Sequence, residues 1–192
     1  WVLGVDLMGV VHGVRLFTPM MLEAAALDSN YRGHITNTAS MAGLLTAPNM
    51  GIYNAAKAAV VSLTETLYHD LNLVTDQIGA SLLCPYFVPT GITSSERNRQ
   101  DAPQAAQLTK SQIIGQAMSN KAVSSGKITA GEIAHRVFDA ISANQFYVFS
   151  HPKALGNVQS RMENIVSVTN PADPFLARPE IGEALRAQLR AA

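Results

Sequence analysis

The stretch Ile35-Thr-Asn-Thr-Ala-Ser40-Met-Ala-Gly43, followed by Gly51-Ile-Tyr53-Asn-Ala-Ala-Lys57, decides the fold expected for this chain of 192 residues. Residues 34–40 alternate as a β-strand does, and the Ala-rich segment from Tyr53 to about Thr75 predicts a long amphipathic helix. The strand would therefore deliver a serine hydroxyl to its carboxyl end, shortly before a helix that begins with a tyrosine and a lysine.

The flanking segments continue this alternation of strands and helices. A helix, kinked near Gly9, is expected from Trp1 to about Ala26, and a buried strand from Ile78 to Cys84. A T-x-x-E capping box at Thr129 predicts a helix to about Ser142, and a third strand is expected over residues 145–150. This order is typical of an α/β protein with a doubly wound parallel sheet of the Rossmann type, with helices on both faces.

We expect residues 1–192 to form a single domain. Residues 91–127, rich in Ser, Asn, Gln and Ala, predict a mobile substrate loop with one short helix. Residues 168–192 predict a C-terminal arm that ends in a small amphipathic helix. Three strands make an incomplete sheet and the chain opens at Trp1 in mid-helix, so we expect the C-terminal part of a larger domain, whose other strands cover the first strand.

Composition limits the class of protein. The fourteen basic and fourteen acidic residues form no cluster, which argues against a nucleic-acid partner. Charges such as Asp6 and Lys57 interrupt the apolar stretches, so no membrane span is expected. Cys84 is the single cysteine and fits a small buried hydrophobe, and the five histidines, on separate elements, show no metal-ligand spacing. These features predict a soluble, cytoplasmic protein without a metal site.

The Tyr53–Lys57 pair is the main chemical signal. Residues four apart share one face of a helix. A phenol normally loses its proton near pH 10, and a nearby ammonium favours the phenolate. The pair alone arises easily by chance, and Ser40 alone would more often be a helix cap. Their conjunction, with Ser40 at a strand end 13 residues before Tyr53, indicates an acid–base site.

These motifs resemble those of the short-chain dehydrogenase/reductase family. The matching features are a Ser followed by Ala-Gly, a Tyr-x-x-x-Lys and a Pro with a Thr shortly after it, here Ser40, Tyr53 with Lys57, and Pro85 with Thr90. The resemblance runs from Trp1 to about Ser150, the C-terminal two thirds of such an enzyme. The Gly-rich nucleotide-binding turn of the family has no counterpart in this stretch, since Gly9 and Gly13 lie within a helix and suit close packing of a neighbour.

The resemblance implies hydride transfer between NAD or NADP and a small secondary alcohol or ketone. Tyr53 would exchange a proton with the substrate oxygen, Ser40 would hold that oxygen, and Lys57 would favour the Tyr53 phenolate and bind the nicotinamide ribose. Pro85, the Val88 backbone and the Thr90 hydroxyl would contact the nicotinamide end. The family also implies a homodimer or homotetramer, and the small residues Ala55, Ala56, Ala58 and Ala59 would let helices approach closely. Preference between NAD and NADP is unreadable without the Gly-rich segment.

Two residues depart from the family pattern. Asp6 replaces the usual Asn, which puts a carboxylate at the proton relay or serves only as a local helix contact. Tyr86 replaces the usual Gly after Pro85, and with Phe87 it is expected to line a site for an apolar or aromatic substrate. Two alternatives stay open: a noncatalytic binding or scaffold subunit of the same fold, and an epimerase or dehydratase, although those enzymes place the serine farther before the tyrosine.

Overall fold

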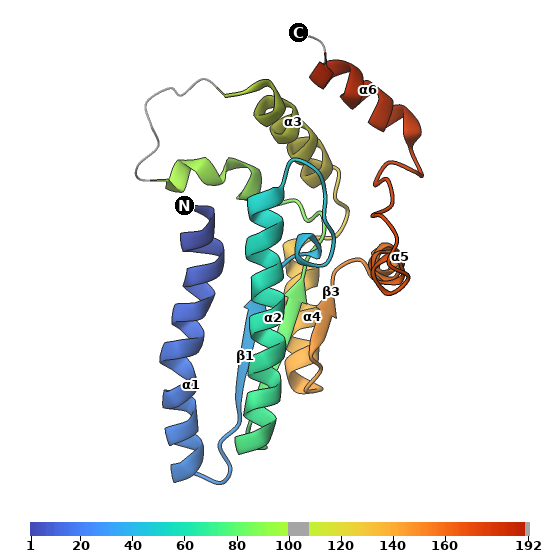
Figure 1. Ribbon diagram of the computed structural model, residues 1–192. Coiled ribbons are helices and arrows are strands. Elements are labelled where there is room, and N and C mark those ends of the chain that lie inside the picture. The colour runs from blue at the N-terminus through green and yellow to red at the C-terminus, as the bar shows by residue number, and fades with distance from the viewer. Residues whose placement is uncertain (100–107, 191–192) are drawn as a thin grey trace.

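A three-stranded parallel sheet forms the centre of the molecule (Figure 1). The computed structural model describes residues 1–99 and 108–190. The strands are β1 (Gly33–Thr38), β2 (Ile78–Cys84) and β3 (Tyr147–Phe149), in the spatial order β1-β2-β3. Gly33 lies opposite Ile78 and Leu82 lies opposite Tyr147, so all three strands end at one edge of the sheet. The expected parallel sheet is confirmed, with β3 shorter than predicted.

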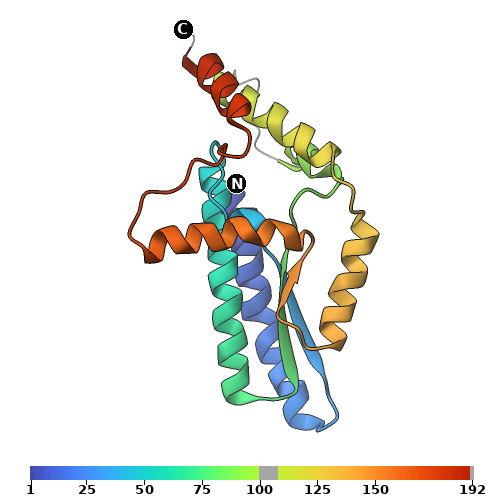
Figure 2. The same cartoon turned by 90° about the vertical axis from the view of Figure 1, so that its right-hand side faces the viewer.

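Two long helices cover one face of the sheet. The π-helix η1 (Leu3–Met8) leads into α1 (Gly9–Leu27), so the expected kink near Gly9 is a change from π- to α-helical winding. Helix α2 (Gly51–Val74) buries Val60, Leu67 and Leu71 against the sheet, while Leu63 is half-buried. In Figures 1 and 2, α1 and α2 run side by side along the strands.

The opposite face carries α4 (Ala130–Ser142), as a doubly wound sheet requires. The predicted capping box is present, because the Glu132 backbone N–H donates to Thr129 Oγ1 (3.2 Å) and the Thr129 N–H donates to Glu132 Oε2 (2.7 Å). Ile133 and Ala140 of α4 pack against Leu83 and Val148. The sheet is therefore sandwiched between two helical layers.

The remaining segments hold more helix than the sequence predicts. Residues 91–127 contain the 3₁₀-helix η3 (Gly91–Asn98) and the fifteen-residue α3 (Lys110–Ser124) instead of one short helix, and residues 100–107 lie outside the described structure. The short 3₁₀-helix η4 (Pro152–Ala154) is followed by α5 (Leu155–Val166), a helix that the sequence patterns do not predict. No residue of α5 is fully buried. The expected C-terminal amphipathic helix is α6 (Pro179–Arg190).

The N-terminal helical run stands out by its length and its apolar composition. Leu3–Leu27 is long and apolar enough, by length and composition, to cross a membrane, and the charges within it do not change this result. A groove of about 520 Å³ lies between α1 and β1, and in the described structure nothing lies within 4 Å of a Cβ built on Gly9 or Gly13, which line the groove.

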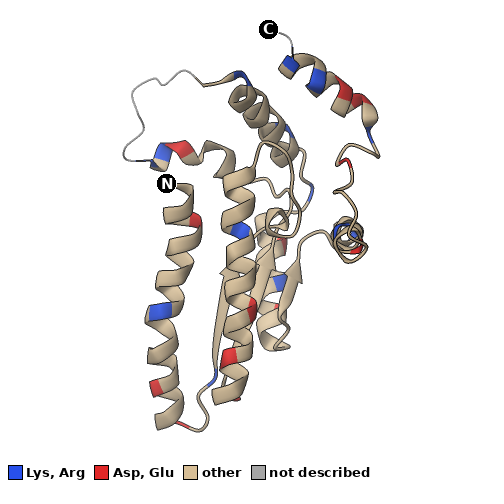
Figure 3. Ribbon diagram, viewed as in Figure 1, with Lys and Arg blue, Asp and Glu red and all other residues tan. Residues whose placement is uncertain are grey.

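Lys and Arg are spread over several elements, as the absence of a basic cluster in the sequence suggests (Figure 3).

Candidate active site

Ser40 stands where β1 ends and the chain turns into the 3₁₀-helix η2 (Met41–Gly43). Its Oγ accepts the Ala42 backbone N–H at 3.1 Å, so Ser40 caps η2. A capping role is the alternative that the sequence also allowed for this serine. The same hydroxyl donates to the carbonyl of Pro85 at 3.4 Å, and the Met41 N–H donates to that carbonyl at 2.9 Å. The carboxyl ends of β1 and β2 are thereby joined at Ser40.

Tyr53 and Lys57 lie in the first two turns of α2. The Lys57 side chain is 9% exposed, and its Nζ lies 5.8 Å from the centre of the Tyr53 ring. Nζ also donates to the carbonyl of Thr38 at 3.2 Å, two residues before Ser40. This hydrogen bond links the lysine to the end of β1, so the three predicted catalytic side chains come from elements that meet at one edge of the sheet.

Asp6 joins this group from the opposite helix. Its Oδ1 lies 3.0 Å from Lys57 Nζ, and the Asp6 side chain is 31% exposed. The residue sits in the π-helical turn of η1, and single π-helical turns are often found at functional sites. Of the two readings left open by the sequence, the structure supports a carboxylate that contacts the lysine directly.

The segment after β2 carries the predicted substrate residues. The rings of Tyr86 and Phe87 pack at 4.1 Å between centres, and the ring of His151 meets Tyr86 edge-on at 5.8 Å. Tyr86 is 38% exposed, and partial burial raises the pKa of its phenol above the usual value. Tyr86 is therefore a protonated, ring-packed side chain at neutral pH, positioned at the same sheet edge as Ser40.

The predicted cofactor residues beyond Pro85 have local roles in this structure. The Val88 side chain packs on the cluster formed by Leu83, Ile133 and Val148, which leaves only its backbone for a ligand. The exposed Thr90 hydroxyl caps η3 by accepting the Ile92 N–H at 3.4 Å. Both residues lie on the segment that leaves the carboxyl end of β2, where open α/β sheets bind dinucleotides.

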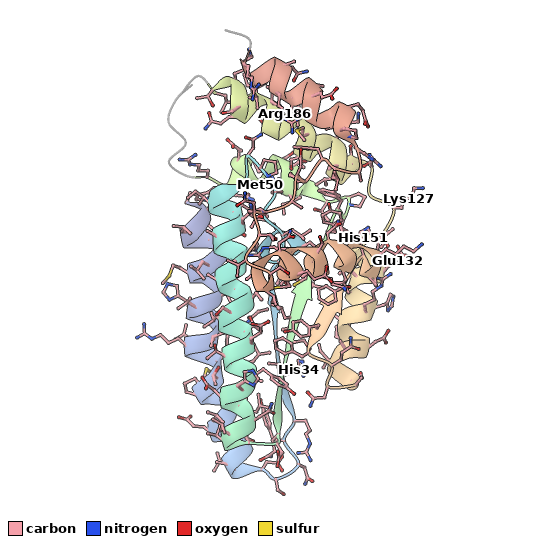
Figure 4. All side chains as sticks on the ribbon, turned by 45° about the vertical axis from the view of Figure 1, so that its right-hand side comes forward. His34, Met50, Lys127, Glu132, His151 and Arg186 are labelled. Atoms are coloured by element: carbon pink, nitrogen blue, oxygen red, sulfur yellow. The ribbon has the colours of Figure 1, made fainter. Side chains whose placement is uncertain are left out.

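Sequence reasoning missed the residues that brace this segment from β3. Ser150 is fully buried, its Oγ accepts the Tyr86 N–H at 2.7 Å, and it bonds His151 Nδ1 at 2.8 Å. Arg136 of α4 donates to the Ser150 carbonyl at 2.7 Å. Figure 4 places His151 beside α5. The only sequence signal was a serine directly after a predicted strand, which is too common to single out.

Cys84 ends β2 just before Pro85. Burial raises the pKa of its thiol to about 12, so the group is neutral at physiological pH. Among the described residues no group of three or more His, Cys, Asp or Glu side chains could hold a metal ion. The histidines lie on separate elements. Figure 4 shows His34 toward the far end of the sheet from Met50, the residue that precedes α2, and shows His151 beside α5.

The fold and site define a class: an α/β protein with a serine, a tyrosine and a lysine at the carboxyl edge of a parallel sheet. The family model described as short chain dehydrogenase matches residues 2–101, and the chain belongs to this family. A short-chain dehydrogenase/reductase from Burkholderia phymatum, solved in complex with NAD, is 52% identical with a TM-score of 0.85, covering 91% of this chain and 60% of that one.

Two further relatives agree. The CLA biosynthesis dehydrogenase/reductase of Lactiplantibacillus plantarum is 29% identical over 87% of this chain and 58% of its own length. A short-chain dehydrogenase from Burkholderia cenocepacia, solved with NADP, shares the fold at 21% identity and a TM-score of 0.53, covering 99% of this chain and 58% of that one. The chain thus spans about 60% of the length of the relatives it matches.

Proposed function

We propose that this chain carries the catalytic part of an NAD- or NADP-dependent oxidoreductase that transfers a hydride between the nicotinamide and a secondary alcohol or ketone. The observation that carries the proposal is the meeting of Ser40, Tyr53 and Lys57 at the carboxyl edge of the sheet, with Lys57 Nζ bonded to the end of β1. The relative solved with NAD supports the cofactor class.

The residues present fit the nicotinamide end of such a cofactor. Lys57 Nζ has three donors, of which the Asp6 carboxylate and the Thr38 carbonyl take two, so one remains for a ribose hydroxyl or the Tyr53 phenol. The backbone from Pro85 to Thr90 borders the same edge. When bound, the nicotinamide supplies the hydride acceptor or donor.

Each side chain has a distinct task in this mechanism. Tyr53 gives its proton to the substrate oxygen in reduction and takes it back in oxidation. Ser40, once its hydroxyl turns from the Pro85 carbonyl, donates to that oxygen and stabilises its developing charge. Lys57 places a positive charge beside the phenol, which favours the phenolate that oxidation requires.

The substrate class is proposed from the aromatic wall formed by Tyr86, Phe87 and His151. The packed rings present an apolar surface at the edge where Ser40 lies. An apolar or aromatic alcohol would bury its body against these rings. Replacing Tyr86 by Ala is expected to lower kcat/KM for aromatic substrates more than for small aliphatic ones.

Substitution of Tyr53 by Phe tests the proposed function. The variant loses the acid–base hydroxyl while the ring remains, so turnover should fall by at least a thousandfold, and binding of reduced cofactor, followed by its fluorescence, should stay nearly unchanged. Tyr68→Phe is the matched control, because Tyr68 lies on the same helix and packs its ring on Phe146. Equal turnover in Tyr53→Phe and the control would refute the mechanism.

The noncatalytic alternative gives a different result in the same assays. A scaffold subunit would show no turnover with any alcohol or ketone and no binding of either nicotinamide cofactor, before any substitution. Intact-mass measurement of the purified protein should come first, because it establishes which length of chain each assay reports on.

We also propose a homo-oligomer in which the exposed Ala55 and Ala58 of α2 take part, whereas Ala56 faces the core.

A further inference from the structure

The direct ion pair between Asp6 and Lys57 sets this site apart from the Asn that the family pattern places at the same position. Asp6 Oδ1 lies 3.0 Å from Lys57 Nζ, and the lysine side chain is 9% exposed. Water screens a pair with one buried partner much less than it screens a surface pair. Water therefore screens the Asp6 carboxylate less than it would screen a carboxylate in a fully exposed pair.

Among the residues that the structure describes, Asp6 is the counter-ion nearest to Lys57. Lys57 extends from α2, Asp6 faces it from η1, and the backbone carbonyl of Thr38 faces it from β1. Cys84 on β2 stays neutral because burial raises the pKa of its thiol to about 12. The negative charge of Glu65, also on α2, raises the pKa of that thiol as well. An amide at position 6 would leave the ammonium with its whole charge; the carboxylate makes a pair of zero net charge.

The pair also lies close to the tyrosine. Lys57 Nζ is 5.8 Å from the Tyr53 ring centre and 3.0 Å from Asp6 Oδ1, so the carboxylate lies within about 9 Å of the ring. An ammonium favours the phenolate, and a carboxylate at this range opposes it. The two effects act on the same proton, and their balance depends on whether residue 6 is charged.

We propose that Asp6 is a positioning residue that holds Lys57 and offsets part of its charge, so that the Tyr53 phenol gives up its proton at a higher pH than it would beside an asparagine. The inference rests on the proposed function, because it gives Tyr53 the role of proton donor and acceptor. Reduction of a ketone needs Tyr53 as a proton donor, so an offset of the Lys57 charge suits reduction over oxidation of an alcohol.

Spectrophotometric titration of Tyr53 tests the proposal on the chain without cofactor or substrate. The absorbance of phenolate is recorded from pH 6 to pH 11 for the unmodified chain and for Tyr53→Phe, and their difference isolates Tyr53. The same pair is then measured with Asp6→Asn. At about 9 Å and an effective dielectric constant of about 20, Coulomb's law predicts that Asp6→Asn lowers the midpoint by about one pH unit, a tenfold rise in the phenolate ratio.

Two variants separate charge from structure. Asp6→Glu keeps the carboxylate and should restore a midpoint close to that of the unmodified chain, while Asp70→Asn removes an equal charge on the exposed end of α2 and should leave it unchanged. An unchanged or higher midpoint in a folded Asp6→Asn chain would overturn the proposal. If Asp6→Asn fails to fold, a midpoint in Asp6→Glu that differs from the unmodified one by more than half a unit would overturn it instead.

The titration and the turnover assay fail independently. A chain that shows no turnover but a lower midpoint in Asp6→Asn would refute the proposed function and leave the electrostatic role of Asp6 intact. Turnover abolished by Tyr53→Phe together with equal midpoints would confirm the function and refute the role of Asp6. Where turnover is measurable, the pH profile of alcohol oxidation in Asp6→Asn should rise about one unit earlier.

Discussion

Gly43 is the point where the turn after Ser40 touches α2, and replacing it by alanine should damage both stability and the site. A Cβ at position 43 would lie 2.6 Å from the backbone oxygen of Lys57 and 3.0 Å from Val61 Cγ2. The first obstacle is helix backbone, which cannot rotate away. Overpacking of this kind costs about 1–3 kcal/mol, and the rigid obstacle places Gly43→Ala near the upper end.

Thermal and urea unfolding measure this cost. For a chain of this length 1 kcal/mol shifts Tm by about 2–4 °C, so a loss of about 3 kcal/mol predicts a Tm lower by about 6–12 °C, with the urea m-value unchanged. Gly156→Ala is the control: Gly156 lies in α5 with nothing within 4 Å of an added Cβ, and the change should stabilise by about 0.5–1 kcal/mol. Equal Tm values for Gly43→Ala and the unmodified chain would refute the reasoning.

Two further predictions follow from titratable groups. Burial lowers the pKa of His34 from its usual 6.5. The stability that neutral His34 contributes is therefore complete above pH 6.5 and is lost as the pH falls through the folded-state pKa. Urea unfolding measured from pH 7 to pH 5 should show a smaller loss of the free energy of unfolding in His34→Gln than in the unmodified chain. Because burial raises the pKa of Cys84 to about 12, a thiol reagent at pH 7.5 should label it only at the rate of unfolding, and rapid labelling of the folded chain would contradict its burial.

The site was predictable from sequence where short-range rules apply. Tyr53 and Lys57 share a helical face because they are four residues apart. The alternation of residues 34–40 predicts a strand that reaches Ser40, and in the structure β1 ends two residues earlier, at Thr38. The Asp6–Lys57 contact joins residues far apart in the chain, and it depends on how η1 lies against α2. No sequence pattern within either segment predicts that these two side chains are in contact.

The sequence by itself determined the order of strands and helices, the parallel sheet and the capping box at Thr129, because hydrophobic period, turn residues and caps act within a few residues of one another. The tertiary structure alone decided the hydrogen bond from the Tyr86 N–H to Ser150, the length of α3 and the existence of α5. Such contacts join segments separated by tens of residues, so their geometry is fixed only when the helices pack on the sheet.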